Sequence, residues 1–111
     1  MALLQSIERQ ILPAGLYQDG DFVLPASWAG AKITINRFAW PDTGEIVLRA
    51  KLSVSDNNFV SQTDYEIETY GGDARHPTTL TIPNIYNKAA KMRTEIELFT
   101  DLDLSVDIEQ L

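Results

Sequence analysis

The residue best suited to acid–base chemistry is a single histidine, His76, which follows Gly-Asp-Ala-Arg and precedes Pro77. A histidine serves as a catalytic base when a positioned nucleophile and an orienting acid complete the site. Asp73, three residues earlier, is the only local acid that could orient it. We therefore interpret His76 as a surface-loop histidine and predict that the protein is not an enzyme.

Metal and nucleotide chemistry also lack the residues they need. With no cysteine and one histidine, the chain does not have the ligands of zinc sites, iron–sulfur clusters or thiol catalysis. Asp56, Asp101 and Asp103 could offer oxygen ligands to calcium, but no calcium-loop motif surrounds them. Gly71-Gly72 lacks the Lys-Ser/Thr and helix of a phosphate loop. We predict no metal and no cofactor.

Two tryptophans are candidates for binding rather than catalysis. Trp28 and Trp40 both lie in predicted loops, next to proline and glycine. Exposed tryptophans could stack on sugar rings or anchor a protein partner, because aromatic side chains dominate interface energetics. Alternatively, both rings cap the ends of the core beneath their own loops. A small carbohydrate-binding module using these tryptophans is one function that the sequence leaves open.

The charge is unevenly distributed along the chain. Nine basic and sixteen acidic residues give a net charge of −7, and six of the acids lie in the stretch 94–111, which has no base. The scarcity of positive charge argues against nucleic-acid binding. The acidic stretch could meet a basic partner, or could keep exposed strands soluble and block edge pairing. Its candidate contact residues are Glu95, Glu97, Asp103 and Asp107.

Length and composition indicate one domain. A chain of 111 residues with 44% hydrophobic residues can bury a core without disulfides or metal, so residues 1–111 are predicted to form one domain. No apolar run approaches the roughly 20 residues of a membrane-spanning helix. The opening Met1-Ala2-Leu3-Leu4 is soon followed by Glu8 and Arg9, which makes it a poor signal peptide. We expect no membrane partner.

Period-two alternation of apolar and polar residues predicts an all-β fold. It is clearest over residues 45–55 and 102–109, and turn residues at short intervals are typical of a sandwich or barrel. We predict a single-domain antiparallel β-sandwich, jelly-roll or Ig-like, with about seven or eight strands. The predicted strands cover residues 21–24, 32–38, 45–55, 64–70, 78–82, 92–100 and 102–109, with a hairpin joining 32–38 to 45–55 through Pro41-Asp42-Thr43-Gly44 and another turn at 56–58.

Two segments remain ambiguous in the sequence. In residues 1–12, Leu3, Leu4 and Ile7 have helical spacing, yet Ile7 and Ile11 also fit an alternating strand. We prefer an extended arm or edge strand, with Leu3, Leu4 and Ile7 available to a neighbouring protein. Residues 84–91 show no alternation and could form a helical turn capped by Asn84.

The predicted outer faces set a condition on strand order. Like charges directly opposite each other on neighbouring strands are destabilising by roughly 0.2 to 1 kcal/mol per pair. The strand 45–55 presents Arg49 and Lys51, whereas 64–70 and 92–100 present glutamates. We predict that the strand carrying Arg49 and Lys51 lies beside one of these acidic strands.

A family resemblance comes from the segment 33–58. It contains Arg37, then Trp40-Pro41-Asp42-Thr43-Gly44, then an alternating strand from Ile46 through Leu52-Ser53-Val54-Ser55 to a turn at Asp56. The segment resembles small β-sandwich proteins encoded among the virion genes of tailed bacteriophages, and the upstream Pro13-Ala14-Gly15-Leu16-Tyr17 is similar in style. The match covers roughly a third of the chain. Where those proteins tend to have a Gly-rich turn followed by Trp, this chain has Asn57-Asn58-Phe59.

The resemblance implies a structural virion protein without catalytic residues, made in the host cytoplasm. It implies a capsid decoration or cement protein on the head surface, bridging major capsid proteins and often trimeric. Neck, tail and fibre-base positions are also consistent with it. The expected partners are thus the major capsid protein or other virion proteins, together with further copies of this chain.

Overall fold

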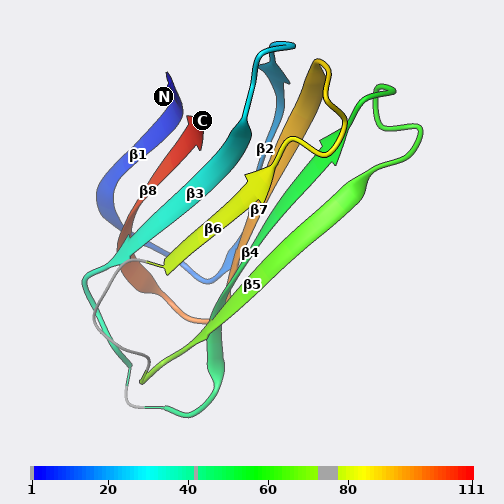
Figure 1. Cartoon of the computed structure of the whole chain (residues 1–111). Helices are drawn as coiled ribbons and strands as arrows, with labels where there is room; N and C mark the ends of the chain where they lie inside the picture. The colour runs from blue at the N-terminus through cyan, green and yellow to red at the C-terminus, as the bar shows by residue number, and fades with distance from the viewer. Residues whose placement is uncertain (1, 42, 73–77) are drawn as a thin grey trace.

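Eight strands form two four-stranded antiparallel sheets that pack face to face (Figure 1). The computed structural model describes residues 2–41, 43–72 and 78–111. Sheet A has the strand order β1-β8-β3-β6, and sheet B has the order β2-β7-β4-β5. The strands are β1 (Ala2–Leu12), β2 (Gly15–Leu24), β3 (Gly30–Arg37), β4 (Ile46–Ser55), β5 (Thr63–Tyr70), β6 (Thr78–Pro83), β7 (Ala90–Leu98) and β8 (Leu102–Gln110).

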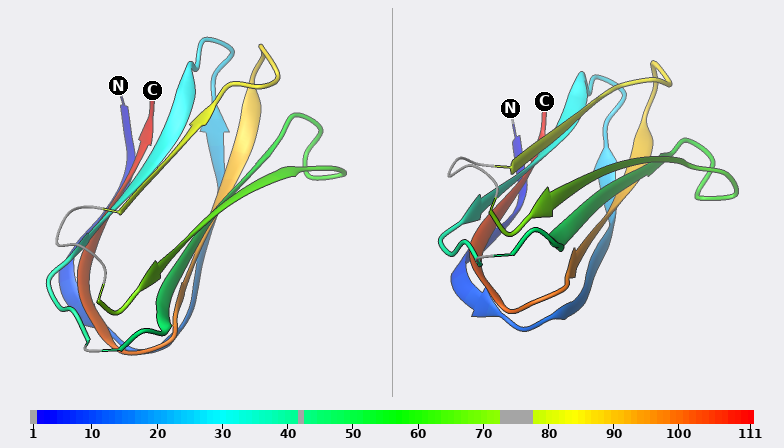
Figure 2. Two further views of the ribbon diagram at one scale, coloured as in Figure 1. Left: turned by 60° about the horizontal axis from the view of Figure 1, so that its bottom comes forward. Right: turned by 90° about the horizontal axis from the view of Figure 1, so that it is seen from below.

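The strand order is that of a jelly roll, which confirms the predicted β-sandwich. Only β4 and β5 are consecutive strands paired in one sheet; every other connection leads from one sheet to the other. Figure 2 shows the two layers drawn together at one end by the β1–β2, β3–β4 and β7–β8 connections. We call this the arch end. The opposite end, formed by the connections 25–29, 56–62 and 84–89, is the loop end.

The core lies between the sheets and is built from the inward faces that the alternation predicts. Along β8, the residues Leu102, Leu104, Val106 and Ile108 are buried while their neighbours are half-exposed. One departure from strict alternation occurs in β4, where both Val47 and Leu48 are buried at a register shift between Ile46 and Leu48. A β-bulge of this kind turns an extra side chain toward the core.

The predicted edge strand at the N-terminus is present. β1 pairs antiparallel with β8, with register shifts between Leu3 and Gln5 and between Ile7 and Gln10. Ile7 is half-buried and packs against the core, so it stabilises this sandwich. The side chains of Leu3 and Leu4 lie outside the described part of the structure.

The predicted hairpin between residues 32–38 and 45–55 is wrong. β3 pairs with β6 and β8, whereas β4 pairs with β5 and β7, so the connecting segment crosses between sheets. The buried Arg37 side chain explains why the chain turns away at this point. Its guanidinium donates to the carbonyl oxygens of Tyr70 at 2.9 Å and Gly71 at 3.1 Å, at the end of β5. This charge-assisted pairing joins the two sheets at the arch end.

The helical turn predicted over residues 84–91 is also wrong, although its capping residue behaves as expected. Asn84 Oδ1 accepts hydrogen bonds from the backbone N–H groups of Tyr86 and Asn87, but no helix follows. Its side-chain amide instead donates to the carbonyl oxygen of Trp28. None of the described residues forms a helix long and apolar enough to span a membrane.

The crowding at Gly71 gives a stability prediction. A Cβ at this position would lie 2.5 Å from the carbonyl oxygen of Pro41 and 2.8 Å from that of Thr43, whereas a Cβ at Gly44 would meet nothing within 4 Å. Gly71→Ala should lower the free energy of unfolding by about 1 to 3 kcal/mol, the usual cost of overpacking, and Gly44→Ala should leave it nearly unchanged. Urea denaturation of both variants measures the difference, and equal midpoints would contradict the arch-end packing.

Candidate functional site

The outer face of sheet B carries a ladder of opposite charges. Arg49 on β4 lies between Glu68 on β5 and Glu97 on β7, at nitrogen–oxygen distances of 3.1 Å and 3.3 Å. Two register positions along, on the same face, Lys51 pairs with Glu95 at 3.6 Å. The prediction that the Arg49 and Lys51 strand lies beside an acidic strand is confirmed, since β4 lies between two of them.

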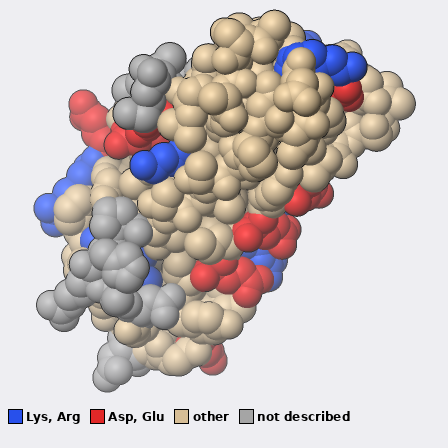
Figure 3. Space-filling view, in the orientation of Figure 1, with Lys and Arg blue, Asp and Glu red and all other residues tan. Residues whose placement is uncertain are grey.

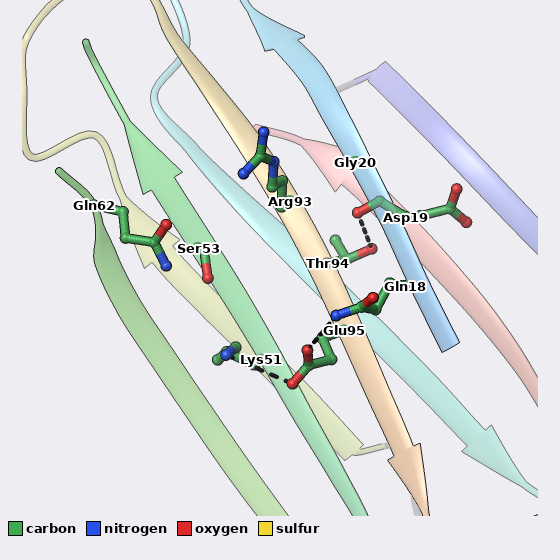
Figure 4. A pocket seen from close by; sticks show the side chains of 9 residues that line it. All are labelled: Gln18, Asp19, Gly20, Lys51, Ser53, Gln62, Arg93, Thr94 and Glu95. Carbon is green, nitrogen blue, oxygen red and sulfur yellow. Dashed lines mark hydrogen bonds and ion pairs between the residues drawn. The ribbon is translucent and has the colours of Figure 1, made fainter. Parts of the chain in front are cut away.

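A polar hollow opens in this face, and we call it the sheet B groove. Its volume is about 430 Å³, within the roughly 300 to 1,000 Å³ range of small-molecule sites. Figure 4 shows its lining residues on β2, β4, β7 and the segment before β5, with the Asp19 side chain pointing away from the others. The lining residues are Gln18, Asp19, Gly20, Lys51, Ser53, Gln62, Arg93, Thr94 and Glu95.

Small residues create the hollow. Ser53 pairs with Arg93 across β4 and β7, and the short Ser53 side chain leaves space beside longer neighbours. On β2, a register shift between Asp19 and Phe22 places Gly20 against the Arg93 stem. A Cβ at Gly20 would lie 3.2 Å from Arg93 Cγ, so this glycine allows the close approach.

The groove side chains are held by hydrogen bonds to one another and to Asp64 on β5. Gln18 Nε2 donates to Glu95 Oε1 at 2.8 Å, and Lys51 pairs with the other oxygen of the same carboxylate (Figure 4). Gln62 Nε2 and Ser53 Oγ both donate to Asp64 Oδ1 at 2.7 Å. The lining contains two acids and two bases, so its formal charges cancel.

One carboxyl group in this network has a shifted acidity. The Ser53 hydroxyl lowers the pKa of Asp64 below its ordinary value, and the Gln62 amide and the Lys51 charge act in the same direction, while desolvation opposes them. Each of the three favours the carboxylate over the protonated acid. Asp64 is therefore an acceptor throughout the neutral pH range.

The acidic residues proposed as one contact surface are split between two sheets. Glu95 and Glu97 lie on β7 in sheet B, whereas Asp103 and Asp107 lie on β8 in sheet A. Each has an intramolecular partner, and in sheet A the partners are Arg9 for Asp103, at 3.0 Å, and Ser6 for Asp107. On the face shown in Figure 3, acids and bases likewise occur in small interspersed groups. The structure does not bring these four residues into a single acidic patch.

The two tryptophans do not share one site, and Trp28 follows the alternative in which the ring caps the core. Trp28 is 2% exposed, and its indole N–H donates to the carbonyl oxygen of Lys88 at 2.7 Å, so this ring is part of the core and is not available to a partner. Trp40 is half-buried at the opposite end, with the Arg37 guanidinium 6.0 Å from its ring centroid. His76 and Asp73 lie outside the described residues. Within the described part, no three acidic or histidine side chains cluster as metal ligands would.

Sequence reasoning missed most of the groove. Gln18 and Gln62 belong to no motif, and the motif that contains Ser53 gave it no binding role. These residues meet because β7 lies between β2 and β4, and β5 lies beside β4. The only signal available was the outward position of Ser53 in the predicted strand 45–55. The other lining residues could be identified only once the strand order was known.

No family model matches the chain, and no curated protein matches it. Among solved structures, one that is similar is TmCBM61 in complex with β-1,4-galactotriose, with 13% sequence identity and a TM-score of 0.46. The similarity covers 91% of this chain, which spans only 64% of the other. At this TM-score the likeness carries no information about function.

The Asp64 network gives a prediction with a defined sign. Ser53→Ala removes the largest cause of the lowered pKa, so the pKa of Asp64 should rise toward its ordinary value. A carboxyl whose pKa is lower in the folded state stabilises the fold above the unfolded value of about 3.9, and this contribution is lost as the pH falls through the folded value. The difference in stability between wild type and Ser53→Ala should therefore narrow below pH 4.

Carboxyl ¹³C NMR titration measures this shift directly. Ser105→Ala is the matched control, because Ser105 lies on sheet A and its hydroxyl accepts only a 3.4 Å hydrogen bond from Asn36 among the described residues. An unchanged Asp64 pKa in Ser53→Ala would contradict the hydrogen-bonding account.

Proposed function

We propose that this chain is a non-enzymatic structural protein of a tailed-phage virion, acting as a capsid decoration protein that bridges major capsid proteins. The observation that carries the proposal is the jelly-roll strand order, an architecture used by viral capsid and lectin domains. This support is fold-level analogy, joined to the resemblance of residues 33–58 to phage virion proteins. The proposed location is the outside of the head.

The edge strand β1 supports a role in assembly. It is eleven residues long and borders sheet A, with β8 as its strand neighbour. An edge strand offers backbone N–H and C=O groups to a neighbouring chain. Its two register shifts limit uncontrolled pairing, since bulges make an edge a poor template. In the proposed role, β1 contacts capsid proteins or further copies of this chain, with a trimer as the expected assembly.

The binding of the chain to heads is the direct test. Heads of the encoding phage, assembled without this chain, should bind the purified protein in co-sedimentation and show added cryo-EM density on the outer capsid surface. Light scattering coupled to size exclusion should give about three times the 12.4 kDa chain mass for a trimer. Complete virions without this chain on the capsid exterior would refute the decoration role, whatever the solution mass.

A second candidate function is saccharide binding, and the sheet B groove favours it. Its amide, hydroxyl, carboxylate and guanidinium groups can donate to and accept from sugar hydroxyls. Because the formal charges of its lining residues cancel, the groove favours a neutral ligand over an ion. This site replaces the tryptophan platform predicted from sequence, since Trp28 is buried.

The saccharide candidate predicts selective loss of binding on changing one groove residue. Gln18→Ala should weaken binding of a neutral oligosaccharide by about three- to tenfold, the effect of one lost hydrogen bond. Gln10→Ala, an exposed glutamine on β1 outside the groove, should have no effect. An array of neutral glycans followed by calorimetry measures both, and no binding by the unaltered chain would eliminate this candidate.

A further inference from the structure

Exposed aliphatic side chains gather at the loop end of the sandwich. Val60, in the β4–β5 loop, is 87% exposed, and Val23, next to the end of β2, is 67% exposed. Ile85, in the β6–β7 connection, is 42% exposed. Single exposed apolar residues are ordinary, but several at one end of a small domain are typical of an interaction surface.

The loop that carries Val60 is held in place by a buried hydroxyl. Ser55 is 1% exposed, and its Oγ accepts from the backbone N–H of Phe59 at 2.9 Å while donating within the same loop. Asn57 Nδ2 donates to Ser61 Oγ, and Asn57 Oδ1 accepts from the backbone N–H of Ser61. The backbone carbonyl oxygen of Asn57 accepts from the N–H of Val60. Val60 is therefore presented by a preorganised loop, which reduces the entropy cost of binding.

Backbone strain is concentrated in the same region. Asn58 and Phe59 have φ values of 57° and 63°, and positive φ is a genuine outlier for a bulky residue such as phenylalanine. The Arg93 guanidinium lies 3.8 Å from the Phe59 ring centroid and is itself held by Asp21 at 2.8 Å. The surroundings thus maintain a strained loop, and retained strain of this kind clusters at binding sites.

A small pocket lies beside this loop and supplies room for a partner's side chain. Its volume is about 240 Å³, and its lining residues are Val23, Ser55, Asp56, Asn58, Ala89, Ala90 and Lys91. This volume is below the roughly 300 Å³ at which small-molecule sites begin. The pocket therefore fits a single protein side chain better than a free metabolite.

The charges at the pocket indicate which side chain. Lys88 is paired with Asp56 at 2.9 Å, and Arg93 is paired with Asp21. Lys91 Nζ donates to the neutral Asn58 Oδ1 at 3.0 Å and forms no ion pair with any described residue. Asp56 also lines the pocket, but Lys88 compensates its charge, so Lys91 leaves the rim with one net positive charge. This charge favours a carboxylate on the incoming partner.

We propose that the loop end docks a neighbouring virion protein through an aliphatic side chain adjacent to a carboxylate. The aliphatic group enters the pocket beside Val23 and Ala89 and packs against Val60, and the carboxylate pairs with Lys91. The identity of the partner as a virion protein rests on the proposed function; the chemistry of the surface comes from the loop end itself.

The test uses the full chain and a defined peptide probe. Acetyl-Ser-Leu-Asp-Ser-amide, added to ¹⁵N-labelled protein, should shift amide signals of Val23, Asn58, Val60, Ala89 and Lys91 and leave the sheet B groove unchanged. The isosteric acetyl-Ser-Leu-Asn-Ser-amide should bind about two- to fivefold more weakly, the range of an exposed ion pair. Lys91→Gln should abolish this preference, whereas Lys32→Gln, which removes the same charge on β3 in sheet A, away from the pocket, should retain it.

Two further variants separate this proposal from the virion role. Val60→Asp should weaken binding both of the peptide and of heads, while Thr79→Asp, which adds the same charge on exposed β6, should not. The loop-end proposal would be overturned if millimolar peptide shifted none of these amide signals, or if Val60→Asp bound heads as well as the unaltered chain does. Either result would leave the virion role standing. Peptide binding without head binding would support the surface and refute the virion role. Concentration-dependent shifts of the same signals without peptide would identify a second copy as the occupant, against the proposal.

Discussion

Burial of one apolar face of each strand between two sheets is the constraint on which the rest of the structure depends. Because side chains alternate along a strand, placing Leu48, Ala50, Leu52 and Val54 in the core leaves Arg49, Lys51 and Ser53 on the outer face. A register slip of one residue would exchange the two sets. The charge ladder of sheet B and its polar groove are therefore consequences of how the core is filled.

Outer-face charges then add specificity to the strand order. β4 carries the bases and lies between β5 and β7, which carry glutamates. Exposed ion pairs contribute little stability individually, but placing β5 directly beside β7 would set like charges opposite each other. The same ladder pairs Glu95 and Glu97, two of the six acids of the stretch 94–111, and Arg9 pairs with a third, Asp103, in sheet A.

The strands were predictable from sequence because alternation is a local property, and β4 and β8 carry it almost without interruption. Partners across sheets were not predictable, because they depend on residues far apart in the chain. The prediction of a hairpin before β4 was wrong because Arg37, at the end of β3, donates hydrogen bonds to Tyr70 and Gly71, more than thirty positions away. Trp28 is buried for a similar reason, as its hydrogen-bond acceptor at Lys88 is sixty residues distant. The groove and the loop end likewise exist only once distant segments meet.

The connectivity also has a consequence for how the chain reaches this state. Only β4 and β5 are paired strands joined by a short turn. The pair most widely separated in sequence is β1 with β8, in which Ala2 lies opposite Gln110. Closing such long loops costs entropy before any contact compensates it, and topologies dominated by distant pairings fold in roughly milliseconds to seconds, far slower than helical bundles. The β4–β5 hairpin, with its Ser55-centred turn, is the local unit from which folding can begin. The edge strand β1 obtains its neighbour only after β8, about a hundred residues further along the chain, has been synthesised.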